Sequence, residues 1–410
     1  MSGTAAGVVI VGAGHAGGTA AALLRQNGYE GPITVVGDEP VAPYQRPPLS
    51  KAWLKGEADA EALMLRPLSF YAEQRIELFL NVKVTGLDPA GKTVTLADGK
   101  RFSYDKLILA TGGRARALPL PGADLEGVLS LRSAADAELL KAALGPGKKM
   151  VVIGGGYIGL EAAASGRALG AEVTVLEKEP RLLARVACEA LSSFFQRYHA
   201  GKGVSFELGA TPVAFEGERG HVTGVKLADG RTLPCDEALI GVGVIPNDEL
   251  ARDAGLECAN GVVVDLSART SDPDIYAVGD VTWRPLPLYD RMFRLESVAN
   301  ALEQAKQAAA AIAGRPAPPH EVTWNWSDQY DLKLQLAGIA FDTDDILVRG
   351  DPDVAKFAVF HLKGPVIRAV EAVNAPAEFM AARQLIGSQR PIDRAKLADP
   401  AVSMKEVAAG

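Results

Sequence analysis

Two stretches of the chain share one order of apolar and polar segments. Residues 9–39 are VIVGAGHAGGTAAALLRQNGYEGPITVVGDE, and residues 151–179 are VVIGGGYIGLEAAASGRALGAEVTVLEKE. Each has a β-branched run, a glycine turn, an Ala- and Leu-rich segment, a second β-branched run and acidic residues. Such runs favour buried strands, and the Ala- and Leu-rich segment favours a helix. The pattern therefore predicts a strand–helix–strand unit that occurs twice.

A second shared pattern follows each unit. Residues 93–113 and 222–246 both contain an alternating apolar and polar segment, an Asp-Gly pair, another such segment and a glycine-rich end. The pairs are Asp98-Gly99 and Asp229-Gly230. Asp-Gly between alternating segments is typical of a tight β-hairpin. We therefore expect the duplication to extend well beyond the glycine turns.

The remaining segments predict a helix, a linker and a small separate domain. Residues 296–312 are Ala-rich and predict a helix, and GRPAPPH at 314–320 predicts a linker. Beyond residue 321, four strand-like stretches precede a helical one, at 332–338, 345–350, 356–362, 366–373 and 378–386. We predict an α/β fold with two duplicated Rossmann-like dinucleotide-binding domains and a small α+β C-terminal domain.

Each unit carries one G-x-G-x-x-G fingerprint. The glycines are Gly12, Gly14 and Gly17 in the first copy and Gly154, Gly156 and Gly159 in the second. The first glycine permits the tight turn, the second lets a pyrophosphate approach the backbone, and the third lets helix pack on strand. The helix N-terminus then offers free N–H groups to the phosphates. Two complete copies predict two dinucleotide sites.

Acidic residues follow each fingerprint at the distance where a carboxylate can bind ribose hydroxyls. They are Asp38 and Glu39 after the first copy and Glu177 after the second. Because Glu177 would repel a 2′-phosphate, we expect the second site to prefer NADH over NADPH. Lys178 could partly accommodate that phosphate, but we expect it to face solvent.

Composition excludes several classes of protein. Hydrophobic residues make up 48% and charged residues 23% of 410 positions, as in ordinary globular domains. The net charge of −7 gives no support to a nucleic-acid surface. With no run of 18 apolar residues and no basic leader before the first strand, we expect a cytoplasmic protein that does not enter a membrane.

The cysteines and histidines do not show the close spacing that is typical of a metal site. Cys188, Cys235 and Cys258 are far apart and odd in number, so we expect reduced structural thiols. The five histidines form no H-E-x-x-H or comparable cluster. The sequence therefore predicts no bound metal.

Several longer stretches resemble one family of flavoproteins. They are VGAGHAG, VGDE, PYQRPPLSK, LILATGG, VVIGGGYIGLE, GVGVIPN, DIYAVGD, ESVANALEQA and WSDQYDLKLQ. Together they resemble the two-domain flavoprotein reductases shaped like glutathione reductase, and among these the putidaredoxin reductase-like ferredoxin reductases of bacterial oxygenase systems. The resemblance covers essentially the whole chain.

The resemblance implies an order of domains and an activity. It implies an FAD-binding domain at 1–113 and 247–320, an NADH-binding domain at 114–246, and a C-terminal domain at 321–410. It implies electron transfer from NADH through FAD to an acidic two-iron two-sulfur ferredoxin. Val298 favours service to a haem-thiolate monooxygenase. The alternatives are an aromatic-ring dioxygenase system, an oxygen, rubredoxin or nitrite-system acceptor, and a signalling flavoprotein resembling apoptosis-inducing factor.

The resemblance also implies individual cofactor contacts. Asp280 is expected to bind the ribityl chain of FAD. Further FAD contacts are expected at Ala16, Asp38, Lys51, Val84, Arg132 and Val298. Cofactor contacts are also expected at Arg46, Ala110, Thr111, Gly112, Tyr157, Ile158, Gly243 and Trp326. Tyr157 is expected either to move and admit nicotinamide or to pack at the helix start.

The segment at 43–51, PYQRPPLSK, has no cysteine where disulfide reductases of this shape carry a redox-active pair. Thiol relay chemistry is therefore excluded there. The resemblance places Lys51 and Glu161 together near flavin N5, where they would tune hydride transfer or form a structural ion pair.

The electron exit is expected at the start of the C-terminal domain. Trp324, Trp326 and Tyr330 lie in a segment whose family counterpart covers the flavin, although core packing would also explain them. An acidic ferredoxin requires a locally basic docking surface, for which Arg66, Lys306 and Lys333 are candidates. We expect a monomer.

Overall fold

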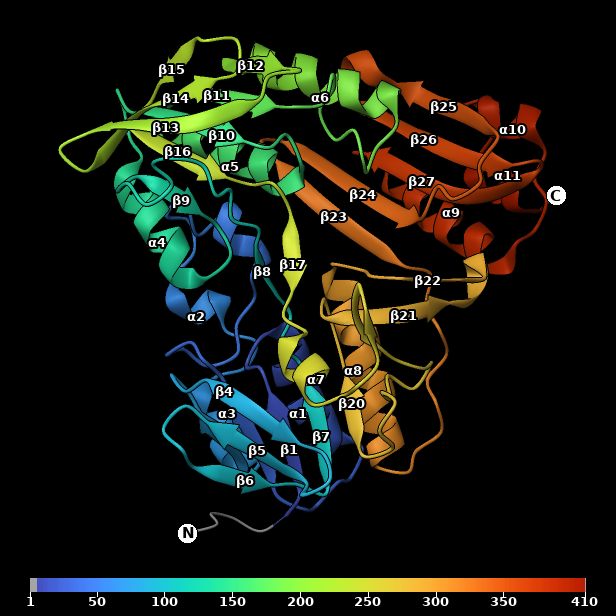
Figure 1. Ribbon diagram of the computed structural model, residues 1–410. Helices are drawn as coiled ribbons and strands as arrows, with labels where there is room; N and C mark the ends of the chain where they lie inside the picture. The colour runs from blue at the N-terminus through green and yellow to red at the C-terminus, as the bar shows by residue number, and fades with distance from the viewer. Residues whose placement is uncertain (1–5, 410) are drawn as a thin grey trace. The chain divides into compact units, whose positions relative to one another are not determined.

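The structure, a computed structural model, describes residues 6–409 (Figure 1). The chain divides into two compact units. Unit 1 comprises Met1–Gln45, Ala60–Arg114 and Ile245–Thr323, and unit 2 comprises Arg46–Asp59, Ala115–Val244 and Trp324–Gly410. The outer bounds 1 and 410 of the predicted domains, and most of the N-terminal stretch inspected for a leader, lie outside the described residues. Within the described part, no helix is long and apolar enough to cross a membrane.

Unit 1 is built on a five-stranded parallel sheet in the order β20-β7-β1-β2-β3. Its strands are β1 (Val8–Val11), β2 (Ile33–Val36), β3 (Ile76–Phe79), β7 (Lys106–Leu109) and β20 (Ile275–Ala277). Every residue of β1 and β2 is buried, as expected for parallel strands covered on both faces. Helices α1 (His15–Gln26) and α8 (Val298–Ile312) pack against each other on one face through small residues such as Ala20 and Ala305.

The other face of the unit 1 sheet packs against a predicted hairpin. Strands β4 (Val84–Asp88), β5 (Thr93–Leu96) and β6 (Arg101–Ser103) form an antiparallel sheet. The turn uses Gly99 at φ +83°, and Asp98 Oδ1 accepts a hydrogen bond from the Lys100 backbone N–H at 3.0 Å. The remaining elements are α2 (Ala60–Leu63), α3 (Leu68–Glu73), α7 (Glu249–Asp253), β18 (Cys258–Ala259), β19 (Gly261–Val263), β21 (Thr282–Leu286), η2 (Pro287–Tyr289) and β22 (Arg291–Phe293).

Unit 2 repeats the arrangement, which confirms the predicted duplication. Its parallel sheet has the order β12-β11-β10-β16-β9, with β9 (Val128–Ser130), β10 (Lys149–Ile153), β11 (Glu172–Glu177), β12 (Val204–Leu208) and β16 (Glu237–Ile240). The antiparallel strands are β13 (Pro212–Glu218), β14 (His221–Leu227) and β15 (Thr232–Pro234), and the helices are α4 (Ala134–Ala143), α5 (Tyr157–Ala168) and α6 (Glu189–Gly201). Here too an Asp-Gly turn is capped by its aspartate, Asp229, which accepts from the Arg231 backbone.

The C-terminal segment of unit 2 forms the predicted α+β structure. An antiparallel sheet in the order β23-β24-β27-β26-β25 is covered by α9 (Pro376–Ser388), α10 (Arg394–Ala398) and α11 (Met404–Ala409). Its strands are β23 (Trp324–Gln329), β24 (Leu332–Gly338), β25 (Asp345–Asp351), β26 (Lys356–Lys363) and β27 (Val366–Val373), with η3 at Pro352–Val354.

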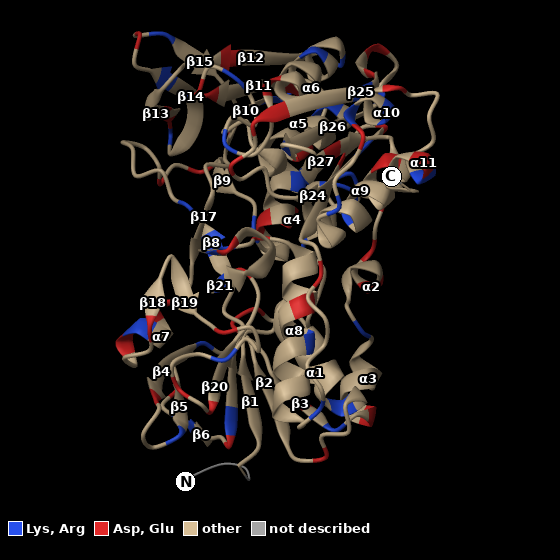
Figure 2. Cartoon of the chain, turned by 90° about the vertical axis from the view of Figure 1, so that its right-hand side faces the viewer, with Lys and Arg blue, Asp and Glu red and all other residues tan. Residues whose placement is uncertain are grey.

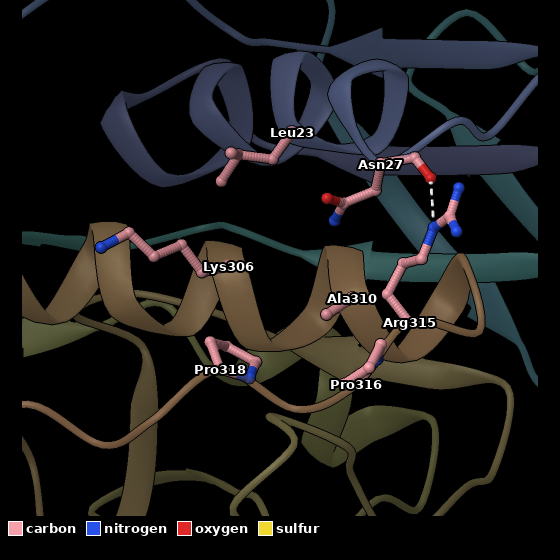
Figure 3. A pocket seen from close by; sticks show the side chains of 7 residues that line it. All are labelled: Leu23, Asn27, Lys306, Ala310, Arg315, Pro316 and Pro318. Carbon is pink, nitrogen blue, oxygen red and sulfur yellow. Dashed lines mark hydrogen bonds between the residues drawn. The ribbon is translucent and has the colours of Figure 1, made fainter.

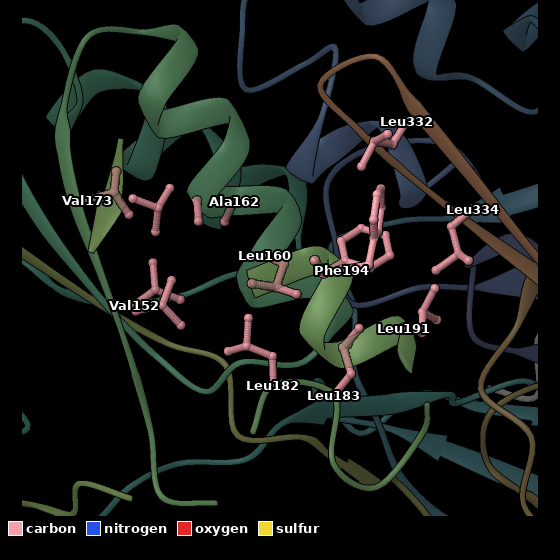
Figure 4. Close-up of a cluster of buried hydrophobic side chains, with 14 of the residues drawn as sticks. Val152, Leu160, Ala162, Val173, Leu182, Leu183, Leu191, Phe194, Leu332 and Leu334 are labelled. Atoms are coloured by element: carbon pink, nitrogen blue, oxygen red, sulfur yellow. The ribbon is translucent and has the colours of Figure 1, made fainter. Parts of the chain in front are cut away.

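This C-terminal sheet shares a core with the second dinucleotide-binding domain. Leu332 and Leu334 of β24 belong to one buried cluster with Leu191 and Phe194 of α6 and Leu160 of α5 (Figure 4). The segment η1 (Pro47–Ser50) and Lys51 also belong to unit 2. The short strands β8 (Gly113–Ala115) and β17 (Val244–Pro246) lie where the chain passes between the units. The three-domain division therefore stays a prediction.

Candidate cofactor and electron-transfer site

A residue larger than glycine would not fit at the first and third positions of either fingerprint. Gly12 and Gly154 both adopt φ +112°, which L side chains rarely adopt. A Cβ on Gly17 would lie 1.9 Å from the Gly12 carbonyl oxygen, and one on Gly159 would lie 2.1 Å from that of Gly154. Only glycine therefore permits the turn and the close packing of helix on strand.

The middle glycines leave space instead. A Cβ on Gly14 or on Gly156 would meet no atom within 4 Å. Both residues are the N-caps of their helices, α1 and α5, and neither helix start has a side-chain cap hydrogen bond. Each helix start therefore presents free N–H groups beside open space, which fits a dinucleotide pyrophosphate.

The acidic residues that follow the fingerprints have different partners. Glu39 Oε2 accepts a hydrogen bond from the Tyr44 hydroxyl at 2.6 Å, and Asp38 is exposed. Glu177 accepts two backbone bonds, from Gly155 at 2.8 Å and Glu179 at 3.0 Å. The Glu177 carboxylate is thereby fixed beside the second fingerprint, with lone pairs left for a ribose.

Lys178 and Gly155 are neighbours of Glu177, in sequence and by a hydrogen bond respectively. Lys178 is 72% exposed and faces solvent as expected. Gly155 itself belongs to the second fingerprint loop, so the bond that it donates to Glu177 joins the end of β11 to that loop.

In unit 1 the structure adds a residue that the sequence analysis missed. His15, inside the first fingerprint, interacts electrostatically with Asp280, and burial lowers the pKa of its imidazole. Its Nδ1 atom is buried and has no hydrogen-bond partner among the described residues. The Gly279 backbone N–H before Asp280 donates to Gln304 Oε1 at 2.9 Å. An unpartnered imidazole nitrogen beside the predicted ribityl-binding carboxylate fits a polar FAD contact at this point.

The other predicted cofactor-binding residues of unit 1 lie on several elements. Ala110 is buried at the end of β7, and Thr111 exchanges hydrogen bonds with Asn247, at 2.7 and 2.9 Å. Gly112 adopts φ +61°, and Val298 is the first residue of α8. Val84 lies in β4, packed against the cluster on the far face of the parallel sheet, away from α1.

Unit 2 contains a buried carboxylate that binds three side chains. Glu161, on α5, is 3% exposed and lies 2.5 Å from Lys51 Nζ. Its Oε2 also accepts from Ser50 at 2.5 Å, and its Oε1 accepts from Ser327 at 2.6 Å. Lys51 alone remains partly accessible, at 16%. The structure therefore brings the predicted pair together, and it adds Ser50 and Ser327.

A chain of hydrogen bonds extends from Glu161 into the core. Ser327 Oγ accepts from Gln329 Nε2 at 3.0 Å, and Gln329 Oε1 lies 2.7 Å from His199 Nε2. Burial lowers the pKa of His199 to about 4, so its ring is neutral at pH 7. The Gln329 carbonyl can only accept, so His199 Nε2 carries the proton. The Ser327 proton is then directed to Glu161, which is held as an acceptor.

The remaining predicted residues of unit 2 lie next to η1 or at the start of α5. Arg46 Nη1 donates to the Arg132 carbonyl at 2.6 Å. Ile158 is 48% exposed at the start of α5, whereas the Tyr157 hydroxyl is buried without a hydrogen-bond partner among the described residues.

The predicted electron-exit aromatics lie on β23 and just after it. Trp326 lies on β23 beside Trp324, with ring centroids 5.6 Å apart, and Arg383 lies over Trp324. Tyr330 packs against His199.

Gly243, a predicted cofactor-binding residue, adopts φ +110° just before β17.

The three cysteines do not form a thiol relay. None lies in residues 43–51, and all three are free. Burial raises the pKa of Cys188 and of Cys235 to about 12, so these thiols stay protonated at neutral pH.

Two further surface features carry no assigned role. A groove between α1 and α8 is lined by Asn27, Lys306 and Arg315, and it contains none of the predicted cofactor residues (Figure 3). Basic and acidic residues are interspersed along the chain (Figure 2). Of the docking candidates, Arg66 and Lys333 are exposed, and Lys306 pairs with Glu321 at 2.8 Å.

The two fingerprints and their sheets agree with comparisons to known proteins. A family model described as "Pyridine nucleotide-disulphide oxidoreductase" matches residues 6–305. The chain belongs to this family. It is therefore an oxidoreductase of the kind that uses FAD and a pyridine nucleotide. A second model, "Reductase C-terminal", matches residues 324–408.

The chain is also similar to individual proteins along its whole length. It is 53% identical over 402 residues to the probable ferredoxin reductase CtmF of Castellaniella defragrans, covering 98% of both chains. It is 41% identical to rubredoxin-NAD(+) reductase of Pseudomonas putida, covering 90% of this chain and 96% of the other.

Two solved structures are similar over nearly the full chain. The reductase in a covalent putidaredoxin reductase–putidaredoxin complex has a TM-score of 0.96, with 42% identity and 99% coverage of both chains. The ferredoxin reductase for the CYP199A2 system from Rhodopseudomonas palustris has a TM-score of 0.95, with 41% identity and coverage of 98% and 100%. These similarities confirm the predicted fold and the resemblance.

Proposed function

We propose that this protein is an NADH-dependent, FAD-containing ferredoxin reductase that serves a haem-thiolate monooxygenase. The observation that carries the proposal is the pair of open glycine cradles, at Gly14 and Gly156, in a chain without a cysteine in residues 43–51. The two cradles can hold two dinucleotides, and residues 43–51 contain no thiol that could accept electrons. FAD, when bound, accepts electrons as a hydride and releases them singly.

The residues of the chain supply binding and charge. The N–H groups at the starts of α1 and α5 bind the two pyrophosphates, and Glu177 binds the NADH ribose. Lys51 has a partly exposed side chain, and Glu161 balances the charge of its ammonium. A fixed cation there stabilises negative charge that develops on a neighbouring acceptor during hydride transfer. Ser50, Ser327 and Gln329 hold the Glu161 carboxylate in place.

The acceptor is inferred from similarity. Three of the four similar proteins named in the preceding section are reductases of ferredoxins or of putidaredoxin, and one of them serves a CYP system. We infer a two-iron two-sulfur ferredoxin and a monooxygenase of that type. Rubredoxin is the second candidate, because the rubredoxin-NAD(+) reductase is 41% identical. An aromatic-ring dioxygenase system is a further alternative, whereas a signalling role gains no support. A cytoplasmic location and a monomeric state stay predictions.

A panel of electron carriers tests the proposal. The FAD-containing protein and NADH are combined under anaerobic conditions with purified two-iron two-sulfur ferredoxins and with a rubredoxin. We expect kcat/KM for at least one ferredoxin to exceed that for rubredoxin at least about tenfold. A higher value for rubredoxin would show that the acceptor is wrong while leaving the FAD and NADH assignments intact.

A further inference from the structure

Three residues with metal-binding side chains meet inside unit 2. His361 lies on β26 and Glu371 on β27, where antiparallel register pairs Val359 with Glu371 and His361 with Ala369. Alternation along each strand puts His361 and Glu371 on one face of the sheet. Cys188 is the N-cap residue of α6. One ligand atom of each, the Cys188 sulfur, a His361 nitrogen and a Glu371 oxygen, lie within 4.8 Å of one another.

One polar atom in this cluster and one beside it have no hydrogen bond within the described part of the chain. His361 and Glu371 are each 6% exposed, and His361 Nε2 lies 3.3 Å from Glu371 Oε2 without forming a hydrogen bond. The Cys188 backbone N–H reaches the two Glu371 oxygens only at 3.3 and 3.5 Å. The Tyr157 hydroxyl, which interacts electrostatically with Glu371 and Cys188, is likewise buried and unpartnered. Buried polar atoms are rarely left in this condition.

The spacing of His361 and Glu371 and the set of donor atoms fit a tetrahedral zinc ion. With Zn–N and Zn–O bonds of about 2.0–2.1 Å, two ligands at a tetrahedral angle lie about 3.4 Å apart. The His361 and Glu371 atoms are already 3.3 Å apart. A thiolate with an imidazole favours Zn²⁺, whereas Mg²⁺ and Ca²⁺ require oxygen ligands. Thiolate, carboxylate and Zn²⁺ also sum to zero charge, which suits a buried site.

We propose that Cys188, His361 and Glu371 bind one Zn²⁺, with the fourth position taken by water. On binding, the Cys188 thiol releases its proton to solvent and forms the Zn–S bond. The ion joins the start of α6 to two strands of the C-terminal sheet, so it acts as a structural cross-link. This site departs from the sequence-based prediction of no metal, because its ligands are too far apart in sequence to form a local motif.

Zinc titration of the FAD-containing protein tests the site. The protein is treated with chelator, desalted, and titrated with ZnCl₂ in a calorimeter. We expect one tight equivalent per chain, and affinity at least about 100-fold weaker in Cys188→Ser and in His361→Gln. The matched controls Cys258→Ser and His221→Gln change the same residue types elsewhere, and they should bind zinc like the unmodified protein. No tight equivalent, or equal affinity in all four variants, would overturn the proposal.

X-ray absorption at the zinc edge decides the ligands independently of any variant. The unmodified protein with one equivalent of Zn²⁺ should show one sulfur at about 2.3 Å and nitrogen or oxygen ligands at about 2.0–2.1 Å. A shell without sulfur would contradict the proposal even if a variant failed to fold. FAD does not contribute to the zinc edge, so the holoenzyme can be used.

Discussion

The two halves of the duplication have nearly the same framework and different buried carboxylates. In unit 1, Glu303 pairs with Arg284 at 3.0 Å, and the two side chains are 9% and 3% exposed. In unit 2, Glu161 pairs with Lys51 at 2.5 Å, and the lysine side chain is 16% exposed. The enclosed pair can only hold the unit together. The pair with an accessible cation can also act on a bound cofactor.

The two glycine fingerprints have nearly the same backbone geometry, whereas the carboxylates that follow them have different hydrogen-bond partners. Gly12 and Gly154 have the same φ, and Gly14 and Gly156 are equally open. By contrast, Glu39 binds a tyrosine side chain, whereas Glu177 binds two backbone N–H groups. We therefore expect both glycine loops to bind phosphates, and residues outside the loops to decide which dinucleotide binds and how it reacts.

The largest expected effect comes from filling each cradle in turn. Gly14→Val and Gly156→Val place a branched side chain in open space at backbone angles that any residue adopts. We expect Gly14→Val to purify without FAD and to lose NADH–ferricyanide activity at least about 1000-fold. Gly156→Val should keep FAD and lower kcat/KM for NADH about 100-fold. Flavin absorbance and steady-state rates measure both.

Gly145→Val is the control, because its Cβ also meets nothing within 4 Å but it lies outside both fingerprints. Retention of FAD in Gly14→Val, or loss of FAD in Gly156→Val, would reverse the assignment of the two halves.

Removal of the accessible cation tests the difference between the buried pairs. Lys51→Met keeps the length of the side chain and removes its charge. We expect FAD to be retained and the rate of flavin reduction at saturating NADH to fall about 100-fold, because the fixed positive charge is lost. Stopped-flow absorbance measures the rate. Lys55→Met, at a lysine that pairs with Glu57 at 2.6 Å, is the control. A change below about twofold in Lys51→Met would make the pair structural, like Arg284–Glu303.

His199, at the buried end of the hydrogen-bond chain in unit 2, should make the stability of the protein depend on pH. The pKa of His199 falls from an unfolded value of 6.5 to about 4, so the unfolded chain binds a proton first as the pH drops. The stabilisation is present above pH 6.5 and is lost as the pH falls toward 4. Between pH 7 and pH 5 the free energy of unfolding should decrease by about 2 kcal/mol through this residue.

Urea unfolding of His199→Gln at both pH values measures this contribution. In the variant, the decrease in the free energy of unfolding between pH 7 and pH 5 should be smaller by about 2 kcal/mol. His320→Gln is the control, because its ring is 37% exposed, and it should leave this decrease unchanged. His15 in unit 1 also has a lowered pKa, so the comparison is made between variants and not from the total slope. An unchanged difference in His199→Gln would show that its ring is not held neutral.

The smallest expected effect concerns the choice of coenzyme. Glu177→Arg removes a ribose acceptor and adds a partner for a 2′-phosphate, so the NADPH-to-NADH ratio of kcat/KM should rise about tenfold. Because Glu177 also accepts from the Gly155 backbone, Glu177→Gln is the matched control: it keeps an acceptor oxygen without the charge. An unchanged ratio in Glu177→Arg would remove Glu177 from the coenzyme site.

Local features of the fold could be predicted from the sequence. The glycine loops depend on residues within six positions, and the Asp-Gly turns depend on neighbouring backbone groups. The duplication predicts that the two units share an architecture, as their two five-stranded parallel sheets do. The C-terminal strands at 332–338 and 366–373 were predicted at their observed bounds.

Contacts between distant residues could not be predicted from spacing, and the Lys51–Glu161 pair, 110 positions apart, was expected from the family resemblance alone. Ser327 reaches Glu161 across 166 positions, and His199 reaches Gln329 across 130, so no sequence spacing indicates either bond. The grouping of Cys188 with His361 and Glu371 depends in the same way on packing of α6 against the C-terminal sheet. Such side chains have no local pattern because the folded core alone brings them together.

Reoxidation of the NADH-reduced holoenzyme tests the central claim most directly. The protein is reduced with one equivalent of NADH under anaerobic conditions and mixed in a stopped-flow instrument with a two-iron two-sulfur ferredoxin, with rubredoxin or with air-saturated buffer. We predict that two ferredoxins are reduced per FAD, at a rate at least equal to steady-state turnover and faster than with rubredoxin or oxygen. Faster reoxidation by oxygen or rubredoxin than by every ferredoxin tested would contradict the proposed function.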